Sequence, residues 1–426
     1  MAPDLLLAAV DLVLVVLVVR CGGALAVRLG EPRIAGEMVG AILVGPTILG
    51  GRIEDVVDGA KSAGIVGDLF PPLAVDVLTS VGALGMILYM LLVGLTIDAQ
   101  PMSRRAGTIL ALALPVIAST GLIALFAASW LEHDGGWKGP LATNVTFMLA
   151  LAAALAAHGV PIAARILEER GLLRSEAGAA VIASGACVTT LALIVSGVAI
   201  RGSDRAAAAE LAVIVAGVVL LVAIVAPLAR SRRMRLSPRI AVAVLLAIAL
   251  GAGAGGKAVI GSVLIGPLIV GIAVRNAGHA AIFLEARLGA IVRGALLPAF
   301  LAVAALHVNL RELGLGAIGP VAALIATVVV AKWVATYLSA RVVGFDRPQS
   351  RATAGLLQCG GIMTVAISLD VLHAGIITTR THALLTLAGL VTTLVAGPLL
   401  AASGLAQGAG DAPADDVAAA AATLAS

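Results

Sequence analysis

The chain has 426 residues, of which 61% are hydrophobic and only 12% are charged, and its mean hydropathy is +1.11. Soluble domains are about half apolar and about one-quarter charged, so this composition excludes a soluble globular protein and predicts an integral membrane protein. The formal net charge of +4 implies no nucleic-acid partner, because the basic residues gather in short loops between apolar runs.

Apolar runs along the chain have the length that a helix needs to cross a bilayer. Each run is about 20 residues, which spans a hydrocarbon core of about 30 Å and is too long for the strands of an outer-membrane barrel. The predicted class is therefore all-α, with about thirteen transmembrane helices. In chain order these cover residues 5–29, 34–50, 72–97, 106–130, 141–164, 177–200, 207–229, 239–255, 258–275, 285–307, 314–340, 350–372 and 381–404.

Loops and ends indicate the orientation and exclude other classes. The strongly basic loops all fall on one side, so the N-terminus is expected outside and the C-terminus inside a cell membrane. Residues 405–426 are small and acidic, which predicts a disordered tail. Cys21, Cys187 and Cys359 show no metal-binding spacing, and no nucleophile–base set is present, so neither a cofactor nor an enzyme activity is expected.

A segment near the start of the chain returns far along it. Residues 40–50 read GAILVGPTILG and residues 261–271 read GSVLIGPLIVG, with the glycines and the proline at the same offsets. The copies lie seven spans apart, and an odd offset makes the two repeats inverted. We expect two six-helix repeats, at about 5–200 and 239–404, joined by a linker helix at about 207–229. Inverted repeats are typical of transporters with alternating access.

Two spans in corresponding positions carry residues that interrupt a helix. The span at 141–164 contains Gly159 and Pro161, and the span at 350–372 contains Gly360 and Gly361. Proline removes a helix donor and glycine permits unwinding. Two such discontinuous helices, crossing at the midplane, predict a binding site made of backbone carbonyls and half-helix ends.

Ionisable side chains inside spans are costly, so each is a functional candidate. Lys332 lies in the middle of VVVAKWVATYLSA and is the strongest, although a lysine that holds helices together is an equal alternative. His158 lies in the first interruption, and histidine titrates near neutral pH, so it is a candidate proton carrier or a hydrogen-bonded structural residue. Glu37, early in its span, is expected to have a structural role.

Several segments in this order resemble the monovalent cation:proton antiporter family of the sodium/hydrogen exchanger type. They are EPRIAGEMVGAILVGPTILG at 31–50, LLVGLTID at 91–98, AHGVPIAARILEERGLLRSEAG at 157–178, LLPAFLAVAALHVNL at 296–310, the Lys332 segment and LVTTLVAGPLL at 390–400. The resemblance implies thirteen spans in a dimerisation domain and a mobile core domain, a homodimer in the lipid bilayer, and a lysine at position 332 that pairs with an acid on the sixth span.

The chain departs from the family at that acid. Where relatives carry an acidic pair or Asn-Asp, the residues here are Val188, Thr189 and Thr190. A bare cation prefers several oxygens and a negative charge, and the threonines offer hydroxyls alone. An unpaired buried lysine favours its neutral form. The candidate ion-binding residues are thus Lys332, His158, Thr189, Thr190 and Gln358.

Three functions remain open on the sequence alone. The first is monovalent cation (Na⁺ or K⁺):proton antiport with an altered site. The second is transport of a small organic solute or anion, motivated by a lysine without its acid. The third is a non-transporting membrane protein built on the same scaffold. A shared fold cannot decide among them.

Overall fold

The computed structural model describes residues 2–49, 70–96, 106–172, 175–201, 238–260, 262–275 and 279–405. In these ranges the regular elements are helices, and an isolated bridge joins Lys138 and Ile377. Nine of the described helical segments are long and apolar enough to cross a membrane. The predicted all-α membrane class is therefore confirmed. The predicted linker at 207–229 and the tail from 406 lie outside the described residues, so the count of thirteen spans stays a prediction.

The helices follow the predicted spans closely. In the first part of the chain they are α1 (Ala2–Arg28), α2 (Arg33–Val44), α3 (Pro46–Leu49), α6 (Pro72–Thr96), α8 (Ala106–Asp134), α9 (Asn144–Ala156), α10 (Val160–Glu169) and α11 (Glu176–Arg201). In the second part they are α14 (Pro238–Ile260), α15 (Ile265–Arg275), α16 (His279–Ile291), a π-helical turn (Val292–Leu296), α17 (Leu297–Leu306), α18 (Ile318–Val343), α19 (Arg347–Leu356), α20 (Gly361–His373) and α21 (Thr379–Ala401), with 3₁₀ turns at Leu310–Leu313 and Leu315–Ala317.

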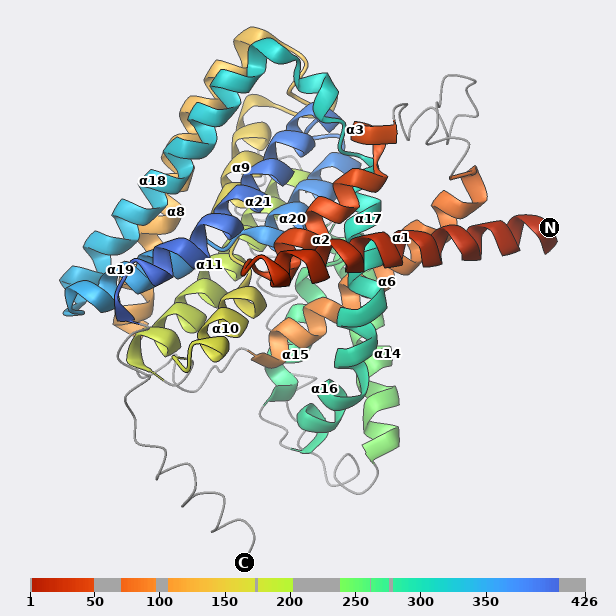
Figure 1. The fold of residues 1–426 in the computed structure, drawn as a ribbon, viewed down its shortest axis with the longest axis horizontal. Coiled ribbons are helices and arrows are strands. Elements are labelled where there is room, and N and C mark those ends of the chain that lie inside the picture. Colours follow the sequence, from red (N-terminus) through yellow and green to blue (C-terminus); the bar gives the residue numbers. More distant parts are fainter. Residues whose placement is uncertain are drawn as a thin grey trace, which may run out of the picture.

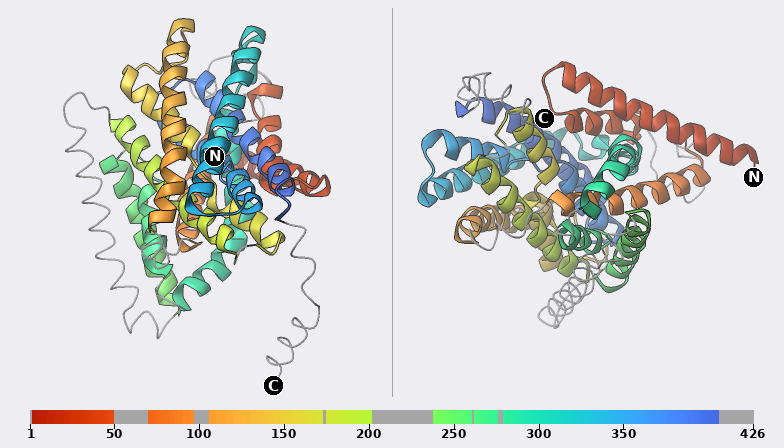
Figure 2. Two further views of the ribbon diagram at one scale, coloured as in Figure 1. Left: turned by 90° about the vertical axis from the view of Figure 1, so that its left-hand side faces the viewer. Right: turned by 90° about the horizontal axis from the view of Figure 1, so that it is seen from below.

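Contacts between helices gather into two groups. The core group contains α8, α9, α11, α18, α19, α20 and α21, and the scaffold group contains α1, α2, α6, α14, α15, α16 and α17. The long helices α8 and α18 lie side by side at the far edge of the core group, as both Figure 1 and the left view of Figure 2 show. On the other side α1 runs across the scaffold group and its N-terminus projects from the molecule.

Glycines bring helices of the scaffold group into close contact. A Cβ on Gly36 of α2 would collide with the backbone of Gly22 in α1, and a Cβ on Gly94 of α6 would collide with the backbone of Leu268 in α15. Small residues let helices approach closely where a membrane supplies no hydrophobic drive for their association. Within the first repeat copy Gly45 is required for the same reason, because a Cβ there would collide with the carbonyl oxygen of Ala305.

The two copies of the repeated segment occupy different local structures. In the first copy the helix ends at Val44, Gly45 is extended, and Pro46 opens the short helix α3. In the second copy α15 begins at Ile265, so that Pro267 falls in the first turn of a longer helix. Both placements suit proline, because the first turn of a helix needs no donor from it. The inverted relation of the two repeats remains a prediction.

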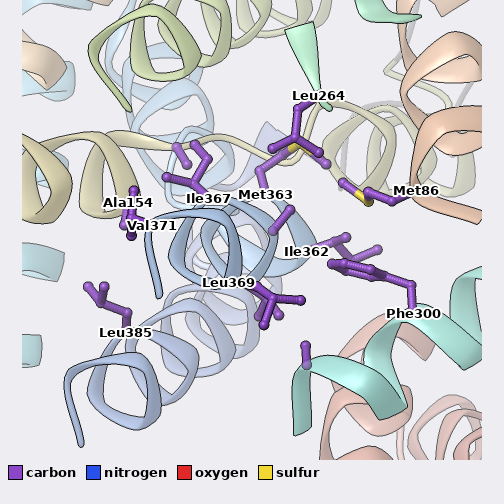
Figure 3. Close-up of a cluster of buried hydrophobic side chains, with 14 of the residues drawn as sticks. Met86, Ala154, Leu264, Phe300, Ile362, Met363, Ile367, Leu369, Val371 and Leu385 are labelled. Atoms are coloured by element: carbon purple, nitrogen blue, oxygen red, sulfur yellow. The ribbon is translucent and has the colours of Figure 1, made fainter. Parts of the chain in front are cut away.

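The two groups meet at an apolar surface along α20. Figure 3 shows Ile362 and Met363 of α20 beside side chains of the scaffold group. Those neighbours are Met86 of α6, Phe300 of α17 and Leu264, which precedes α15. These side chains are almost fully buried. The surface that joins the groups here is therefore close-packed. Polar contacts lie beside it, since the Ser368 hydroxyl of α20 is 2.9 Å from Nδ1 of His382, whose Nε2 donates to the carbonyl of Ala304 in α17 at 3.0 Å.

Candidate functional site

Both predicted interruptions are present in the structure. The first helix stops at Ala156 and resumes as α10 at Val160, where Pro161 occupies the first turn. The second stops at Leu356 and resumes as α20 at Gly361, whose φ of 44° lies in the left-handed region that favours glycine. Each interruption leaves carbonyl groups at the end of the first half-helix without helical donors.

The two interruptions are in direct contact. The backbone N–H of Gly159 donates to the carbonyl of Cys359 at 2.6 Å. The broken segments at 157–159 and 357–360 therefore lie against each other, far apart in sequence and close in space. All their described side chains are buried. Unwound backbone at membrane depth is tolerated only where protein or a water-filled cavity satisfies it, and here the partner segment does so in part.

Lys332 belongs to α18, and its side chain reaches the C-terminal end of α9. Its side chain is 1% exposed, and its Nζ donates to the carbonyl of Leu155 at 3.2 Å. That carbonyl is in the last turn of a half-helix, where the partial negative charge of the helix dipole concentrates. A cation is favoured at this position, and the lysine ammonium group occupies it. His158 and Cys359 are close enough to interact electrostatically with the ammonium.

His158 is completely buried in the first interruption. Its ring packs against Gly185 of α11, in the space that a Cβ on that glycine would need. Neither ring nitrogen makes a well-formed hydrogen bond to the described residues, although the Leu357 backbone is close enough to interact with the ring. The imidazole therefore lies beside the Lys332 ammonium and the second interruption, and its hydrogen-bonding capacity is used only in part.

Thr189 and Thr190 differ in what their hydroxyls do. The Thr189 hydroxyl donates to the carbonyl of His158 at 2.6 Å and accepts from the N–H of the same residue at 3.2 Å. It therefore ties α11 to the first interruption. The Thr190 hydroxyl instead donates to the carbonyl of Ala186 in its own helix, and no contact described in the structure brings it to the crossing.

Gln358 joins the second interruption to α18. Its amide nitrogen donates to the carbonyl of Val329 at 3.2 Å, one turn before Lys332, while its Oε1 is buried without a partner among the described residues. Four further buried hydroxyls have no hydrogen-bond partner among the described residues and were not expected from the sequence: those of Ser184, Thr336, Thr353 and Thr386. The sequence does contain a signal for Thr336, because this residue follows Lys332 by four positions and therefore shares its helix face.

A polar contact joins the two groups near the C-terminal end of α20. The Ser262 hydroxyl, between α14 and α15, donates to Oδ2 of Asp370 at 2.5 Å. Asp370 lies eight residues after Ile362, or about 12 Å along the helix. This bond crosses from the scaffold group to the core group, and no pattern in the sequence predicts it.

Glu37 has the structural contact that the sequence predicts. Its carboxylate is 3% exposed and accepts a hydrogen bond from Arg20 of α1 at 3.1 Å. The guanidinium of Arg20 thus pairs with a buried carboxylate and joins α1 to α2.

Comparisons with known proteins agree with this architecture. The family described as "Sodium/hydrogen exchanger, transmembrane" matches residues 13–403. The chain is 26% identical to Cation/H(+) antiporter 17 of Arabidopsis thaliana over 91% of its own length and 47% of that protein. It is 25% identical to K(+)/H(+) antiporter 1 of Saccharomyces cerevisiae, over 87% of the chain and 43% of that protein. The chain thus spans about half the length of these relatives.

Two other matches cover both proteins almost completely. Na(+)/H(+) antiporter NhaS4 of Synechocystis is 22% identical over 93% of this chain and 97% of that protein. The solved structure of the sodium proton antiporter MjNhaP1 from Methanocaldococcus jannaschii superposes with a TM-score of 0.68 at 15% identity, covering 95% of this chain and 98% of that one. The structural match shows the fold, and the family match covers nearly the whole chain. The chain therefore belongs to the sodium/hydrogen exchanger family of monovalent cation:proton antiporters.

Proposed function

We propose that this chain exchanges a monovalent cation for protons across a membrane, with Lys332 as the proton carrier. The observation that carries the proposal is the bond from the buried Lys332 ammonium to the Leu155 carbonyl at the end of a half-helix. A site that already holds one cationic group beside exposed carbonyl dipoles is chemically suited to hold another in its place. The printed names of the relatives, all cation antiporters, point the same way.

The exchange follows from competition between two positive charges. An ammonium and a metal cation about 4 Å apart repel each other by about 4 kcal/mol at an effective dielectric constant of about 20. That repulsion corresponds to a factor of about 1,000 in affinity. The cation therefore binds when Lys332 has released its proton, and leaves when the amine is protonated again. One ammonium charge replaces one cation charge, so we expect electroneutral exchange.

The oxygens for the cation come from the crossing itself. When the ammonium bond is lost, the Leu155 carbonyl becomes available, and Oε1 of Gln358 is already without a partner among the described residues. Thr189 keeps a lone pair beyond its two bonds to His158. No carboxylate stands at positions 188–190. A site of neutral oxygens is expected to bind its cation weakly and to release it readily.

Movement between the two groups would expose the site alternately to each side. The surface along α20 is mainly apolar (Figure 3), so sliding would break few directional bonds. These include the bonds from His382 to Ala304 and from Ser262 to Asp370, and we propose the second as a gate. We infer two inverted six-helix repeats, a homodimer, and a cell membrane with the arginine-rich loop ends inside, as the sequence predicts.

Transport assays in liposomes test the proposal. The purified chain is reconstituted with a pH-sensitive dye inside, and Na⁺ or K⁺ is added outside. We expect cation-dependent alkalinisation of the lumen, because a proton leaves as each cation enters. This signal should be insensitive to a potassium–valinomycin membrane potential in the sodium assay. Absence of any cation-dependent pH change in vesicles with verified insertion would remove the proposal.

The bond between Ser262 and Asp370 gives a prediction for the gate. Replacing Ser262 with alanine removes the hydroxyl that joins the groups, so we expect the site to open more often toward that end of α20. Cys359 is buried at the crossing and reports this opening. In a background of Cys21→Ser and Cys187→Ser, a membrane-impermeant thiol reagent should alkylate Cys359 about tenfold faster in Ser262→Ala, since one such hydrogen bond is worth about 1.5 kcal/mol.

Ser339→Ala is the matched control for this experiment. Its hydroxyl donates within α18 to the Ala335 carbonyl, and no described contact takes it to the scaffold group. The control should leave the alkylation rate unchanged. An equal rate in Ser262→Ala and in the parent would show that the bond does not gate access.

A further inference from the structure

A cavity of about 530 Å³ lies between the two groups, at the start of α20. Helices α1, α2, α6 and the π-helical turn line it from the scaffold side, and α10 and α20 line it from the core side. Its size falls within the range of about 300–1,000 Å³ that small-molecule sites occupy. It lies at the opposite end of α20 from the bond between Ser262 and Asp370.

The cavity carries an excess of positive charge. Its lining includes four arginines, Arg20, Arg33, Arg165 and Arg293, but only two glutamates, Glu31 and Glu37. Of the two glutamates, Glu37 accepts a hydrogen bond from Arg20. Both Arg33 and Arg165 are close enough to interact with the charge of Glu37. One buried carboxylate thus faces three guanidinium groups from three helices.

Two of these arginines, Arg33 and Arg293, retain capacity for another acceptor. The Nε of Arg33 is buried and has no hydrogen-bond partner among the described residues. Arg293 makes an ion pair with Glu285 at 3.7 Å, with both side chains about half exposed, which is a weak contact. It projects from the π-helical turn at Val292–Leu296, and such turns are frequent at functional sites. Arginines from four elements therefore converge on one cavity, and two of them keep donors for another acceptor.

The geometry points to a binding site for a phosphate-bearing anion in this cavity. A guanidinium presents planar pairs of donors that match phosphate oxygens, and several arginines around one anion add charge-assisted bonds. Ile34, Ile162 and Leu297 supply an apolar part of the wall. Such a wall suits either the organic portion of a soluble phosphate ester or the glycerol region of a phospholipid. The cavity adjoins the crossing, since Pro161, Ile162 and Ile362 line it, and an anion site there goes beyond the exchange that we propose.

The test uses the purified full chain in an uncharged maltoside detergent. Inorganic pyrophosphate is the soluble probe, and dioleoyl phosphatidic acid in mixed micelles is the lipid probe, with phosphatidylcholine as its control. Thermal unfolding and isothermal calorimetry report binding without any transport step. We expect one of the two probes to bind, and Arg33→Gln and Arg165→Gln each to raise its Kd about tenfold, as loss of one charge-assisted contact implies.

Controls separate a built site from general attraction to a basic protein. Arg351→Gln removes an exposed arginine of α19 that does not line the cavity, and it should leave the Kd unchanged. Arg33→Lys keeps the positive charge but loses the paired guanidinium donors, so we expect a Kd between those of the parent and Arg33→Gln. This variant replaces Arg33→Gln if the latter does not fold. Binding of pyrophosphate alone assigns a soluble ligand, and binding of phosphatidic acid alone assigns a lipid. Binding of neither, or equal loss in Arg351→Gln, overturns the site.

Discussion

Replacing Lys332 with arginine should abolish cation-dependent proton movement while the protein still folds. Arginine keeps the positive charge that the carbonyl end of α9 favours, but its guanidinium is not deprotonated in proteins. A permanent cation at this position would exclude the transported ion at every pH. We expect the initial rate in proteoliposomes to fall by about 100-fold or more, which corresponds to about 2.7 kcal/mol.

Two comparisons make the result specific. Lys257→Arg makes the same substitution at an exposed lysine of α14, and it should leave the initial transport rate unchanged. Lys332→Met removes the charge and the proton carrier together, so it should also stop proton movement, although cation binding measured by calorimetry should survive. Proton-coupled transport at the normal rate in Lys332→Arg would contradict the assignment of Lys332 as carrier. A loss of thermal stability without a change in rate would assign it a purely structural role.

The sequence was sufficient for the features that depend on local composition. Span positions follow from apolar runs, because a helix in lipid must satisfy its backbone internally over a fixed length. The interruptions at Gly159–Pro161 and Gly360–Gly361 follow from residues that do not continue a helix. The order of the segments was enough to identify the family, and the family match over residues 13–403 confirms it.

The contacts that assemble the site were beyond the sequence. Thr189 remains a predicted ion ligand, and the structure adds that its hydroxyl joins the N–H and the carbonyl of His158, which lies 31 residues away. Ser262 and Asp370 are separated by 108 residues, and no local pattern distinguishes them from ordinary polar residues at helix ends. Such pairs depend on how the helices pack, so periodicity and composition carry no information about them.

The missing acid of the sixth span also shows the difference between what the sequence predicts and what the packing of the helices determines. The sequence shows that positions 188–190 hold no carboxylate, but it does not show what the lysine does without one. In the structure the Lys332 ammonium donates to a half-helix carbonyl, so a backbone dipole partly takes the role of the absent charge. This arrangement is why we expect a weaker cation site and a lysine that exchanges its proton, and it connects the departure from the family to a mechanism.

Gly185→Ala should be the most damaging change of a single methyl group at the crossing. A Cβ at this position would lie 2.5 Å from Nε2 of His158 and closer still to a ring carbon, so the ring has to move. His158 is held in the interruption by both of its backbone bonds to Thr189, which limits how far it can yield. We expect the free energy of unfolding to fall by about 1–3 kcal/mol, as overpacking of a buried site does, with loss of exchange in liposomes.

A double variant tests whether the His158 ring is the group that collides with the added methyl group. Gly185→Ala combined with His158→Ala removes the colliding atoms, so thermal stability should recover most of the loss, and the coupling between the two sites should exceed about 0.5 kcal/mol. Gly121→Ala in α8 is the matched control, because a Cβ there meets nothing within 4 Å. That change should be neutral or slightly stabilising, since alanine favours the helix. If the double variant is as unstable as Gly185→Ala alone, the collision lies elsewhere and the ring is not fixed at the crossing.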